Sequence, residues 1–169
     1  MIEDLLIRPA TERDAPSLVA FNHAMAKETE GRELTIEVLC AGVASLLKQP
    51  QYGFYLVVET DGVVIGGLLV TYEWSDWRNG LFWWIQSVYV SPPHRGKGVY
   101  KRLYAEVRRR AAAQGNVCGF RLYVEKENHR AQQTYRTLGM RETDYRIFEA
   151  TIGEAGEARA RCEVEVIDR

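Results

Sequence analysis

The sequence predicts an α/β fold in which helices cover both faces of one mixed, mostly antiparallel sheet. Segments with apolar residues at every third or fourth position alternate with short apolar runs rich in β-branched and aromatic residues. Three of these runs follow one another with only turns between them, which predicts an antiparallel meander. The order of the predicted elements is β, α, α, three antiparallel strands, α, β, α, β.

Length and composition fit one domain. The chain has 169 residues, of which 46% are hydrophobic and 27% charged, which is enough apolar material for a core. We expect residues 1–152 to form a single domain. Residues 153–169 are expected to be a C-terminal extension, either a tail or an edge strand, because residues 162–167 alternate apolar and acidic side chains. The formal net charge of −1 lacks the basic excess of a general nucleic-acid binder, so no nucleic-acid partner is expected.

The first part of the chain predicts a strand and two helices. Residues 5–8 form a short apolar strand. Thr11 can cap a helix that runs to about Glu28, with Asp14 three residues on as the acid of a capping box. A second amphipathic helix is predicted over residues 36–48.

The middle of the chain predicts the meander. Residues 54–59 form a strand, and Asp61–Gly62 is a strong signal for a two-residue hairpin turn. The return strand covers residues 63–72, and the turn-rich residues 73–80 lead into a long apolar and aromatic strand over residues 81–90.

The last part predicts two more helices and two more strands. Apolar residues recur every four positions from Val99 until Gly115, which is the expected helix stop. Residues 120–124 form a strand, Asn128 can cap a last helix, and residues 140–150 are predicted to be mostly strand.

A glycine-rich segment, Arg95–Val99, lies between the long strand and the helix that follows it. A strand, a glycine-rich turn and a helix N-terminus together point several backbone N–H groups at one place, where the helix dipole favours an anion such as phosphate. A P-loop would need a hydroxyl after Lys97, but Gly98 follows it. A dinucleotide-binding Rossmann motif would need a third glycine where Arg102 stands.

Two segments together resemble the GNAT superfamily of acyl-CoA N-acyltransferases, over about residues 5–150. They are Val88-Tyr89-Val90-Ser91-Pro92 with Arg95-Gly96-Lys97-Gly98-Val99, and Glu125-Lys126-Glu127-Asn128-His129-Arg130-Ala131 through Tyr135, Leu138, Gly139 and Met140. The resemblance implies the GNAT-like acyl-CoA N-acyltransferase fold.

The loop departs from the family pattern at one position. The family loop is written [QR]-x-x-G-x-[GA], and this chain has Arg95 and Gly98 but Tyr100 where Gly or Ala is expected. Since Tyr100 already belongs to the helix, its backbone needs no glycine. We expect its side chain to point away from the phosphates, against Tyr104 one turn on.

By this resemblance the acyl donor is acetyl-CoA (coenzyme A), and no metal is implied. Backbone N–H groups of the loop would hold the pyrophosphate, and the pantetheine arm would pair with the strand before the loop. The implied cofactor-binding residues are Val88, Tyr89, Val90, Arg95, Gly96, Lys97, Gly98, Val99, Tyr100, Lys101 and Asn128.

The resemblance also implies a catalytic role for Tyr135, which follows Asn128 by about two helical turns. Its phenol would donate a proton to the departing CoA thiolate. A backbone N–H near Val88 would stabilise the oxyanion. No cysteine lies near the motifs to carry the acetyl group, so an N-acetyltransferase with direct attack of a primary amine in a ternary complex is expected. The alternative is a catalytically silent GNAT-fold protein that binds CoA as a sensor or regulatory module.

The base that takes the proton of the amine is not identified by the sequence. Many family members use a glutamate on or near the strand before the loop, but residues 81–90 contain no acid. The candidates are Glu73, Asp76, and a water relay through Gln86 or Ser87.

The acceptor is expected to be an amine on a small molecule or a peptide. The acids Glu28, Glu30 and Glu33 could attract a cationic amine or simply be exposed. The tryptophans are either strand packing, an acceptor pocket, or a surface for a homodimer; they are Trp74, Trp77, Trp83 and Trp84.

No metal site, disulfide framework or membrane association is expected. The three cysteines and three histidines are scattered, without metal-ligand spacing. The N-terminus is acidic where a signal peptide needs basic residues, and the longest apolar stretch is too short to span a bilayer. The cytoplasm is therefore the expected location.

Overall fold

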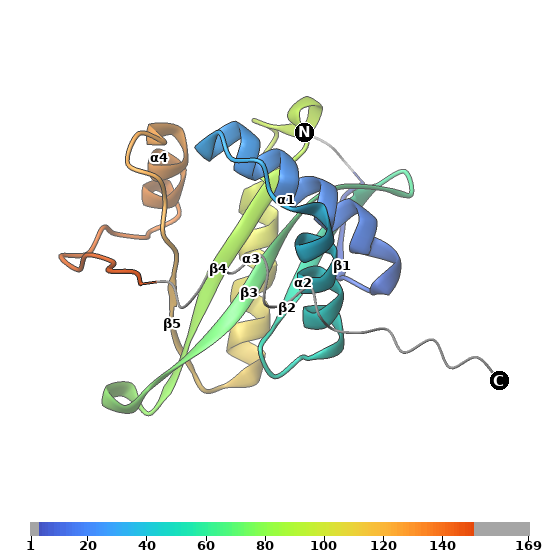
Figure 1. The fold of residues 1–169 in the computed structure, drawn as a ribbon. Coiled ribbons are helices and arrows are strands. Elements are labelled where there is room, and N and C mark those ends of the chain that lie inside the picture. The colour runs from blue at the N-terminus through green and yellow to red at the C-terminus, as the bar shows by residue number, and fades with distance from the viewer. Residues whose placement is uncertain (1–3, 151–169) are drawn as a thin grey trace.

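The computed structural model describes residues 4–150, which form one five-stranded sheet covered by helices on both faces (Figure 1). The strands lie in the order β1-β2-β3-β4-β5. Their bounds, in the same order, are Leu6–Pro9, Gly53–Thr60, Val63–Ser75, Gly80–Val90 and Val117–Arg121. Neighbouring strands run antiparallel except β4 and β5, which run parallel. This confirms the predicted mixed, mostly antiparallel sheet.

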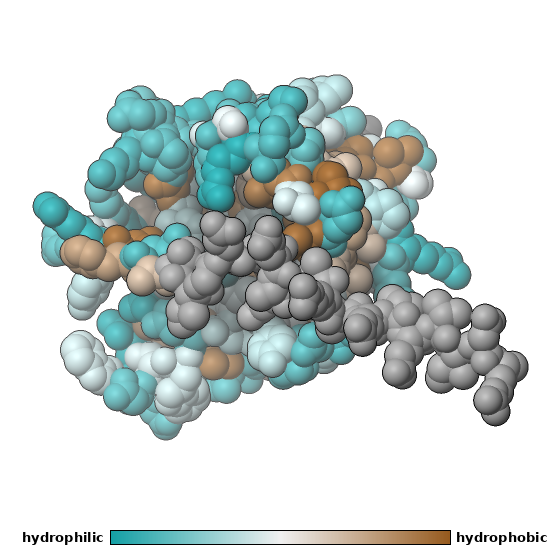
Figure 2. Space-filling view, in the orientation of Figure 1, coloured by the Kyte–Doolittle hydropathy of each residue, from teal (hydrophilic) through white to brown (hydrophobic). Residues whose placement is uncertain are grey.

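The helices divide between the two faces of the sheet. Helices α1 (Ala15–Glu30) and α2 (Ile36–Lys48) lie on one face, α3 (Val99–Gln114) lies on the other, and the short α4 (His129–Thr137) lies at the edge of the sheet that ends in β5 (Figure 1). Seen from the α1 and α2 side, most of the surface is hydrophilic and the hydrophobic areas are separate and small (Figure 2). No helix within residues 4–150 is long and apolar enough to cross a membrane.

Each face of the sheet has its own hydrophobic core. The core under α3 is the larger and contains Leu103 and Val107 of the helix, both fully buried. At its centre Trp83 is 1% exposed and meets the rings of Phe54 and Phe120 edge-on. Full burial of a leucine or valine side chain such as those of Leu103 and Val107 contributes about 1.5–3 kcal/mol to the stability of the fold. Helix α3 is therefore stabilised by packing rather than by its own helix propensity.

The core under α1 and α2 is smaller. It is built from Leu18 and Val43 of the helices and from Tyr55 and Val57 of β2. At the start of α1 the backbone N–H of Thr11 donates to the Asp14 carboxylate at 2.7 Å, as the capping-box pattern predicts. The residues between them form a 3₁₀ turn, Glu12–Asp14, so the α-helix itself begins at Ala15.

A bulge bends β4 just before its end. Gly67 pairs with Tyr89 but Leu69 pairs with Gln86, so two residues of β4 face one residue of β3. Ser87 has a φ of 49°, which is uncommon for a residue other than glycine. The bulge re-aims the last residues of β4 away from the line of the first part of the strand.

Strands β4 and β5 are paired only near their beginnings. The parallel ladder joins Leu81–Trp84 to residues 117–121. Beyond Trp84 the residues of β4 have no partner on β5, so the two strands part toward the end of β4 (Figure 1).

Two sequence expectations about strands are wrong. Residues 140–150 are not strand, because they form no ladder with β5, and all positions from 141 to 150 are exposed. Alternating side chains stabilise a strand only when one face is buried, and this segment buries neither. Strand β5 also begins three residues before the predicted 120–124 and ends at Arg121. The expected extension at 153–169 lies outside the described residues.

Candidate functional site

The loop between β4 and α3 has the backbone of an anion site. Gly96 and Gly98 have φ values of 74° and 81°, a left-handed conformation that glycine adopts without steric cost. Gly98 is the N-cap of α3, and no side chain of residues 4–150 caps this helix end. The first N–H groups of α3 therefore lie at the end of the helix where its dipole attracts negative charge.

Cationic side chains flank this helix end. Lys97 and Lys101 are both exposed. The Nη2 atom of Arg130, on α4, lies 3.9 Å from the point where a Cβ on Gly96 would be. The sequence reasoning did not give Arg130 a role, because only the fold brings the start of α4 to the loop.

The side chain of Arg95 is turned toward the protein. Its Nε donates to the carbonyl oxygen of Val90 at 2.7 Å, and its Nη2 donates to the Glu28 carboxylate at 2.7 Å. The guanidinium also lies 5.1 Å from the centre of the Tyr89 ring. Arg95 therefore fastens the loop to the C-terminal part of α1, and its backbone remains the part that faces the helix end.

Glu28 joins α1 to both β4 and the loop. Its other carboxylate oxygen accepts a hydrogen bond from the Tyr89 hydroxyl at 3.1 Å. The Tyr89 ring stacks on Phe21 of α1 at 5.2 Å, and burial, followed by the Glu28 carboxylate, raises the pKa of this phenol. Because Glu28 is 61 and 67 residues from these partners, no local spacing in the sequence indicates the bridge.

The side chains at the end of β4 pack against the two faces of the sheet. The backbone of these residues has no ladder partner on β5. Val88 and Val90 pack against the core under α3, whereas Tyr89 points to α1. The side-chain contacts thus hold this stretch from both faces of the sheet. The backbone of residues 88–90 that faces β5 is therefore unpaired within the sheet, and an extended ligand can form hydrogen bonds with it.

Asn128 caps its own helix. Its side-chain oxygen accepts a hydrogen bond from the backbone N–H of Ala131 at 3.1 Å. The Gln132 amide donates to the carbonyl oxygen of Lys126 at 2.7 Å and so ties the preceding turn to α4. The N-cap interpretation of Asn128 is confirmed, and the expected contact with pantetheine stays a prediction.

Tyr135 lies on α4 and is partly buried. Burial raises the pKa of its phenol, so the group keeps its proton at neutral pH and is available as a donor. The ring of Tyr100 meets Tyr135 edge-on, with ring centres 5.6 Å apart at 72°. Tyr100 also stacks on Tyr104 at 6.3 Å, which is the orientation expected from the sequence.

The acids considered as bases already have partners. Glu73 accepts hydrogen bonds from Arg121 of β5 and from the indole of Trp84. Asp76 accepts from the backbone N–H of Trp77 at 2.8 Å, inside the turn between β3 and β4. Of the two, only Glu73 lies in the sheet, where it pairs with Phe82 of β4.

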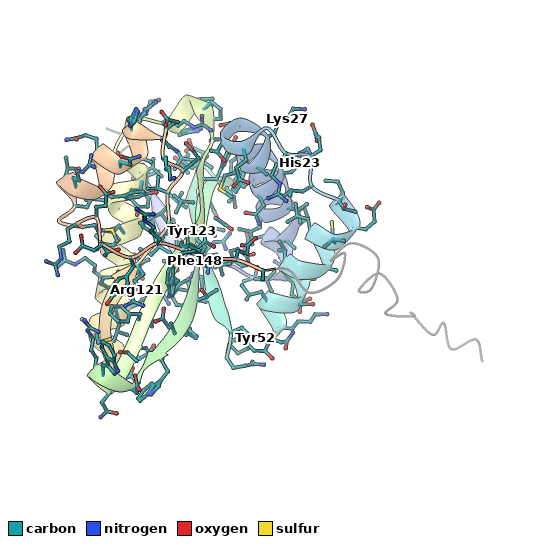
Figure 3. The ribbon with its side chains drawn as sticks, turned by 60° about the vertical axis from the view of Figure 1, so that its left-hand side comes forward. His23, Lys27, Tyr52, Arg121, Tyr123 and Phe148 are labelled. Carbon is teal, nitrogen blue, oxygen red and sulfur yellow. The ribbon has the colours of Figure 1, made fainter. Side chains whose placement is uncertain are left out.

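Gln86 and its neighbours form a polar and aromatic patch beside Glu73. Its side chain donates to the Thr71 hydroxyl and accepts from the Tyr123 hydroxyl at 3.0 Å. The Trp84 ring lies 5.7 Å from the Tyr123 ring and 5.9 Å from the Arg121 guanidinium. Figure 3 labels Arg121 and Tyr123 beside the strands, with His23 and Lys27 on α1.

The three acids at the end of α1 are also paired with cations. Glu28 binds Arg95, Glu30 lies 3.4 Å from Arg32, and Glu33 binds both Lys27 and His23. They therefore do not form an isolated negative patch for a cationic amine. Within residues 4–150 no group of three or more histidine, cysteine or acidic side chains is arranged to hold a metal.

Comparison with known proteins decides the family. The model of the acetyltransferase (GNAT) family matches residues 15–140, which is more than half of the chain. The chain belongs to the GNAT acetyltransferase family. It is thus an acetyltransferase of a family that depends on acetyl-CoA. A search of curated proteins gives no match.

Solved structures agree with this assignment. A possible acetyltransferase from Clostridium difficile 630 is 44% identical, with a TM-score of 0.82 over 89% of this chain and 99% of that chain. A predicted acetyltransferase from Clostridium acetobutylicum, solved with acetyl-CoA, is 18% identical, with a TM-score of 0.73 over 87% and 96%. AAC(6')-Iy, solved with the bisubstrate analogue CoA-S-monomethyl-acetylneamine, is 20% identical, with a TM-score of 0.70 over 89% and 99%. The last two show that the fold is shared.

Proposed function

We propose that this acetyltransferase moves the acetyl group of acetyl-CoA to a primary amine by direct attack in a ternary complex. The parting of β4 and β5 directly before an uncapped helix N-terminus carries this proposal. One feature suits an extended amide-bearing chain and the other suits a pyrophosphate, and the two are joined by a short loop. Relatives of the same fold are solved with acetyl-CoA and with a CoA bisubstrate analogue.

The donor site would bind acetyl-CoA mainly through main-chain groups, with a smaller contribution from cationic side chains. Backbone N–H groups from Arg95 to Lys101 would hold the pyrophosphate, because the left-handed glycines and the start of α3 turn several of them one way. Arg130 would add charge from α4, since its guanidinium lies beside Gly96. The backbone of residues 88–90 would pair with the pantetheine arm.

Acetyl-CoA supplies a thioester whose carbonyl carbon is open to attack by an amine. The amine nitrogen forms the new C–N bond as the C–S bond breaks and the sulfur leaves with the electron pair. Tyr135 would donate its proton to that sulfur; a phenol holds its proton at neutral pH, and burial raises the pKa of this one further. A backbone N–H near Val88 would stabilise the charge that develops on the carbonyl oxygen.

The amine must lose a proton during the transfer. Glu73 is a carboxylate in the sheet next to Trp84, and it would act directly or through a water held near Gln86. Its ion pair with Arg121 of β5 holds the carboxylate at this place in the sheet. Asp76 is less suitable, because it is used to cap the turn at the far end of the β3–β4 hairpin.

The acceptor belongs to the class of amines on small molecules or peptides. AAC(6')-Iy was solved with an acetylneamine analogue, which makes amino sugars one group to test. The alternative function is a protein that binds CoA without turnover. Loss of turnover on removal of the Tyr135 hydroxyl separates the two functions, because a binding module needs no proton donor.

The first experiment is a calorimetric titration with acetyl-CoA, with ATP–Mg²⁺ as the control ligand. We expect acetyl-CoA to bind with a Kd on the order of micromolar and ATP–Mg²⁺ not to bind. Release of the CoA thiol is then followed with kanamycin, spermidine and a lysine-containing peptide as acceptors. Tyr135→Phe should lower kcat by about 100-fold with a nearly unchanged KM for acetyl-CoA. Tight binding without thiol release from any amine would favour the binding module, and no binding of acetyl-CoA would overturn the proposal.

A further inference from the structure

We propose that Tyr100 positions Tyr135 for acetyl transfer through the edge-to-face contact of their rings. This inference rests on the proposed function, in which Tyr135 is the proton donor. It concerns the position at which the glycine or alanine of the family loop is replaced in this chain.

The Tyr100 ring is itself firmly placed. It is the second residue of α3, and it packs against the core that contains the buried Leu103 and Val107. Tyr104, one turn further along α3, stacks on it with an interplanar angle of 17°. The ring therefore offers Tyr135 a rigid surface that belongs to the best-packed helix of the molecule.

Tyr135, in contrast, is on an element with few anchors of its own. Helix α4 has nine residues, and none of them is fully buried. Among residues 4–150, the only aromatic ring that meets Tyr135 is that of Tyr100, at 5.6 Å and 72°. An edge-to-face pair has a preferred geometry, so this contact sets the orientation of the Tyr135 ring and not only its burial.

The ring of Tyr100, rather than its hydroxyl, makes this contact. The hydroxyl is fully buried and has no hydrogen-bond partner among the described residues. A buried donor without a partner destabilises the fold, so its removal is expected to be neutral or stabilising. Tyr100→Phe therefore keeps the positioning contact and removes only a group that contributes nothing to it.

The test compares Tyr100→Phe, Tyr100→Leu, Tyr135→Phe and the double variant Tyr100→Leu/Tyr135→Phe. The acceptor is hydroxylamine, which is small and largely neutral at neutral pH, so it needs no shaped acceptor pocket and no base to remove a proton before it attacks. We expect a loss of about 10-fold in kcat for Tyr100→Leu, and a much smaller loss for the conservative variant Tyr100→Phe because it keeps the ring, with a nearly unchanged KM for acetyl-CoA in both. Adding Tyr100→Leu to Tyr135→Phe should cost almost no further kcat, because a residue that acts through Tyr135 has no effect once the phenol is gone.

Val107→Ala is the matched control for general destabilisation. Val107 is fully buried on the same helix, two turns beyond Tyr100, and it should lower the unfolding temperature without lowering kcat. If Tyr135→Phe loses kcat but Tyr100→Leu does not, or if the two losses multiply, the role of Tyr100 is refuted while the proposed function stands. If Tyr135→Phe keeps full kcat, or if the wild-type protein does not transfer acetyl to hydroxylamine above background, the donor role falls and this inference falls with it.

Discussion

Arg8 of β1 joins the turn before α1 to the distant strand β2. Its guanidinium donates to both oxygens of Asp14, at 2.8 and 2.9 Å, and to Glu59 of β2 at 2.8 Å. The Asp14 carboxylate is 4% exposed and also accepts two hydrogen bonds from Thr11. The hydrogen bonds from Arg8, more than those from Thr11, hold the pKa of Asp14 at about 2.

Asp14→Asn should therefore remove a contribution to stability that depends on pH in the wild-type protein. The folded-state pKa of about 2 lies below the ordinary aspartate pKa of 3.8, so the carboxylate contributes stability above pH 4 and loses it as the pH falls toward 2. The shift corresponds to about 2 kcal/mol, and urea unfolding at pH 7 should show a loss of about that size in the variant. The gap between the two proteins should narrow below pH 4.

Glu33→Gln is the control for this prediction. Glu33 is also paired, with Lys27 and His23, but its carboxylate is exposed to solvent, where ion pairs contribute little. The urea midpoint of this variant should equal that of the wild-type protein at pH 7. Equal midpoints for Asp14→Asn and the wild-type protein would show that the Arg8 cluster does not stabilise the fold.

At the level of elements, β3 leaves no room for a side chain at Gly66, where it faces the part of β4 at which the donor site begins. A Cβ on Gly66 would lie 2.6 Å from the carbonyl oxygen of Tyr89 and 3.2 Å from the Cα of Val90. Both neighbours are backbone atoms, so they cannot move aside without moving the strand. The glycine therefore allows the end of β4 to lie where it does.

Gly66→Ala should push the end of β4 away from β3. We expect a loss of about 1–3 kcal/mol in the free energy of unfolding and a weaker Kd for acetyl-CoA, measured by denaturation and calorimetry. Gly42→Ala is the matched control, because Gly42 lies inside α2 with no atom within 4 Å of the added Cβ. That change should stabilise the protein by about 0.5–1 kcal/mol and leave acetyl-CoA binding as it is. Similar effects from both variants would refute the close-contact explanation.

Local patterns in the sequence predicted most elements but not how distant ones meet. Helix α3 and the β2–β3 hairpin follow from apolar spacing, Gly115 and the Asp61–Gly62 turn, and the structure contains both. The strand expected over residues 140–150 is absent, because alternation alone does not provide a partner strand. Secondary structure is therefore predictable where the signals are local, and less so where pairing decides.

For the candidate site, the glycine loop, Asn128 and Tyr135 were recognisable from motifs. The bulge at Ser87 was not, because it depends on the register between β3 and β4. Neither was the Glu28 bridge to Arg95, which spans 67 residues, nor the approach of Arg130 to Gly96. Each of these is a contact between elements, which a single sequence does not record.

At the level of the whole molecule, the sheet separates α3 on one face from α1 and α2 on the other. The glycine loop begins α3, which covers one face, while α1 covers part of the other face. The open patch with Glu73, Gln86 and Tyr123 lies between them at the strands that part. Donor and acceptor could therefore approach the same gap from different sides, as direct transfer in a ternary complex requires.

We also propose that residues 1–152 are a complete domain. Within residues 4–150, both hydrophobic cores are built from residues before 141, so a chain that ends at residue 152 should keep its fold. The unfolding midpoint and the Kd for acetyl-CoA of the truncated and full chains should agree. A large fall in the midpoint would show that residues 153–169 belong to the folded unit.

Glu28 links the end of α1 to the end of β4 and to the glycine loop. One carboxylate holds the hydroxyl of Tyr89 in the strand and the guanidinium of Arg95 in the loop, while its backbone belongs to the last turns of α1. If the loop moved on binding a phosphate, either the end of α1 would move with it or the ion pair between Arg95 and Glu28 would break. A change in the position of the loop would therefore be coupled to the position of the end of α1.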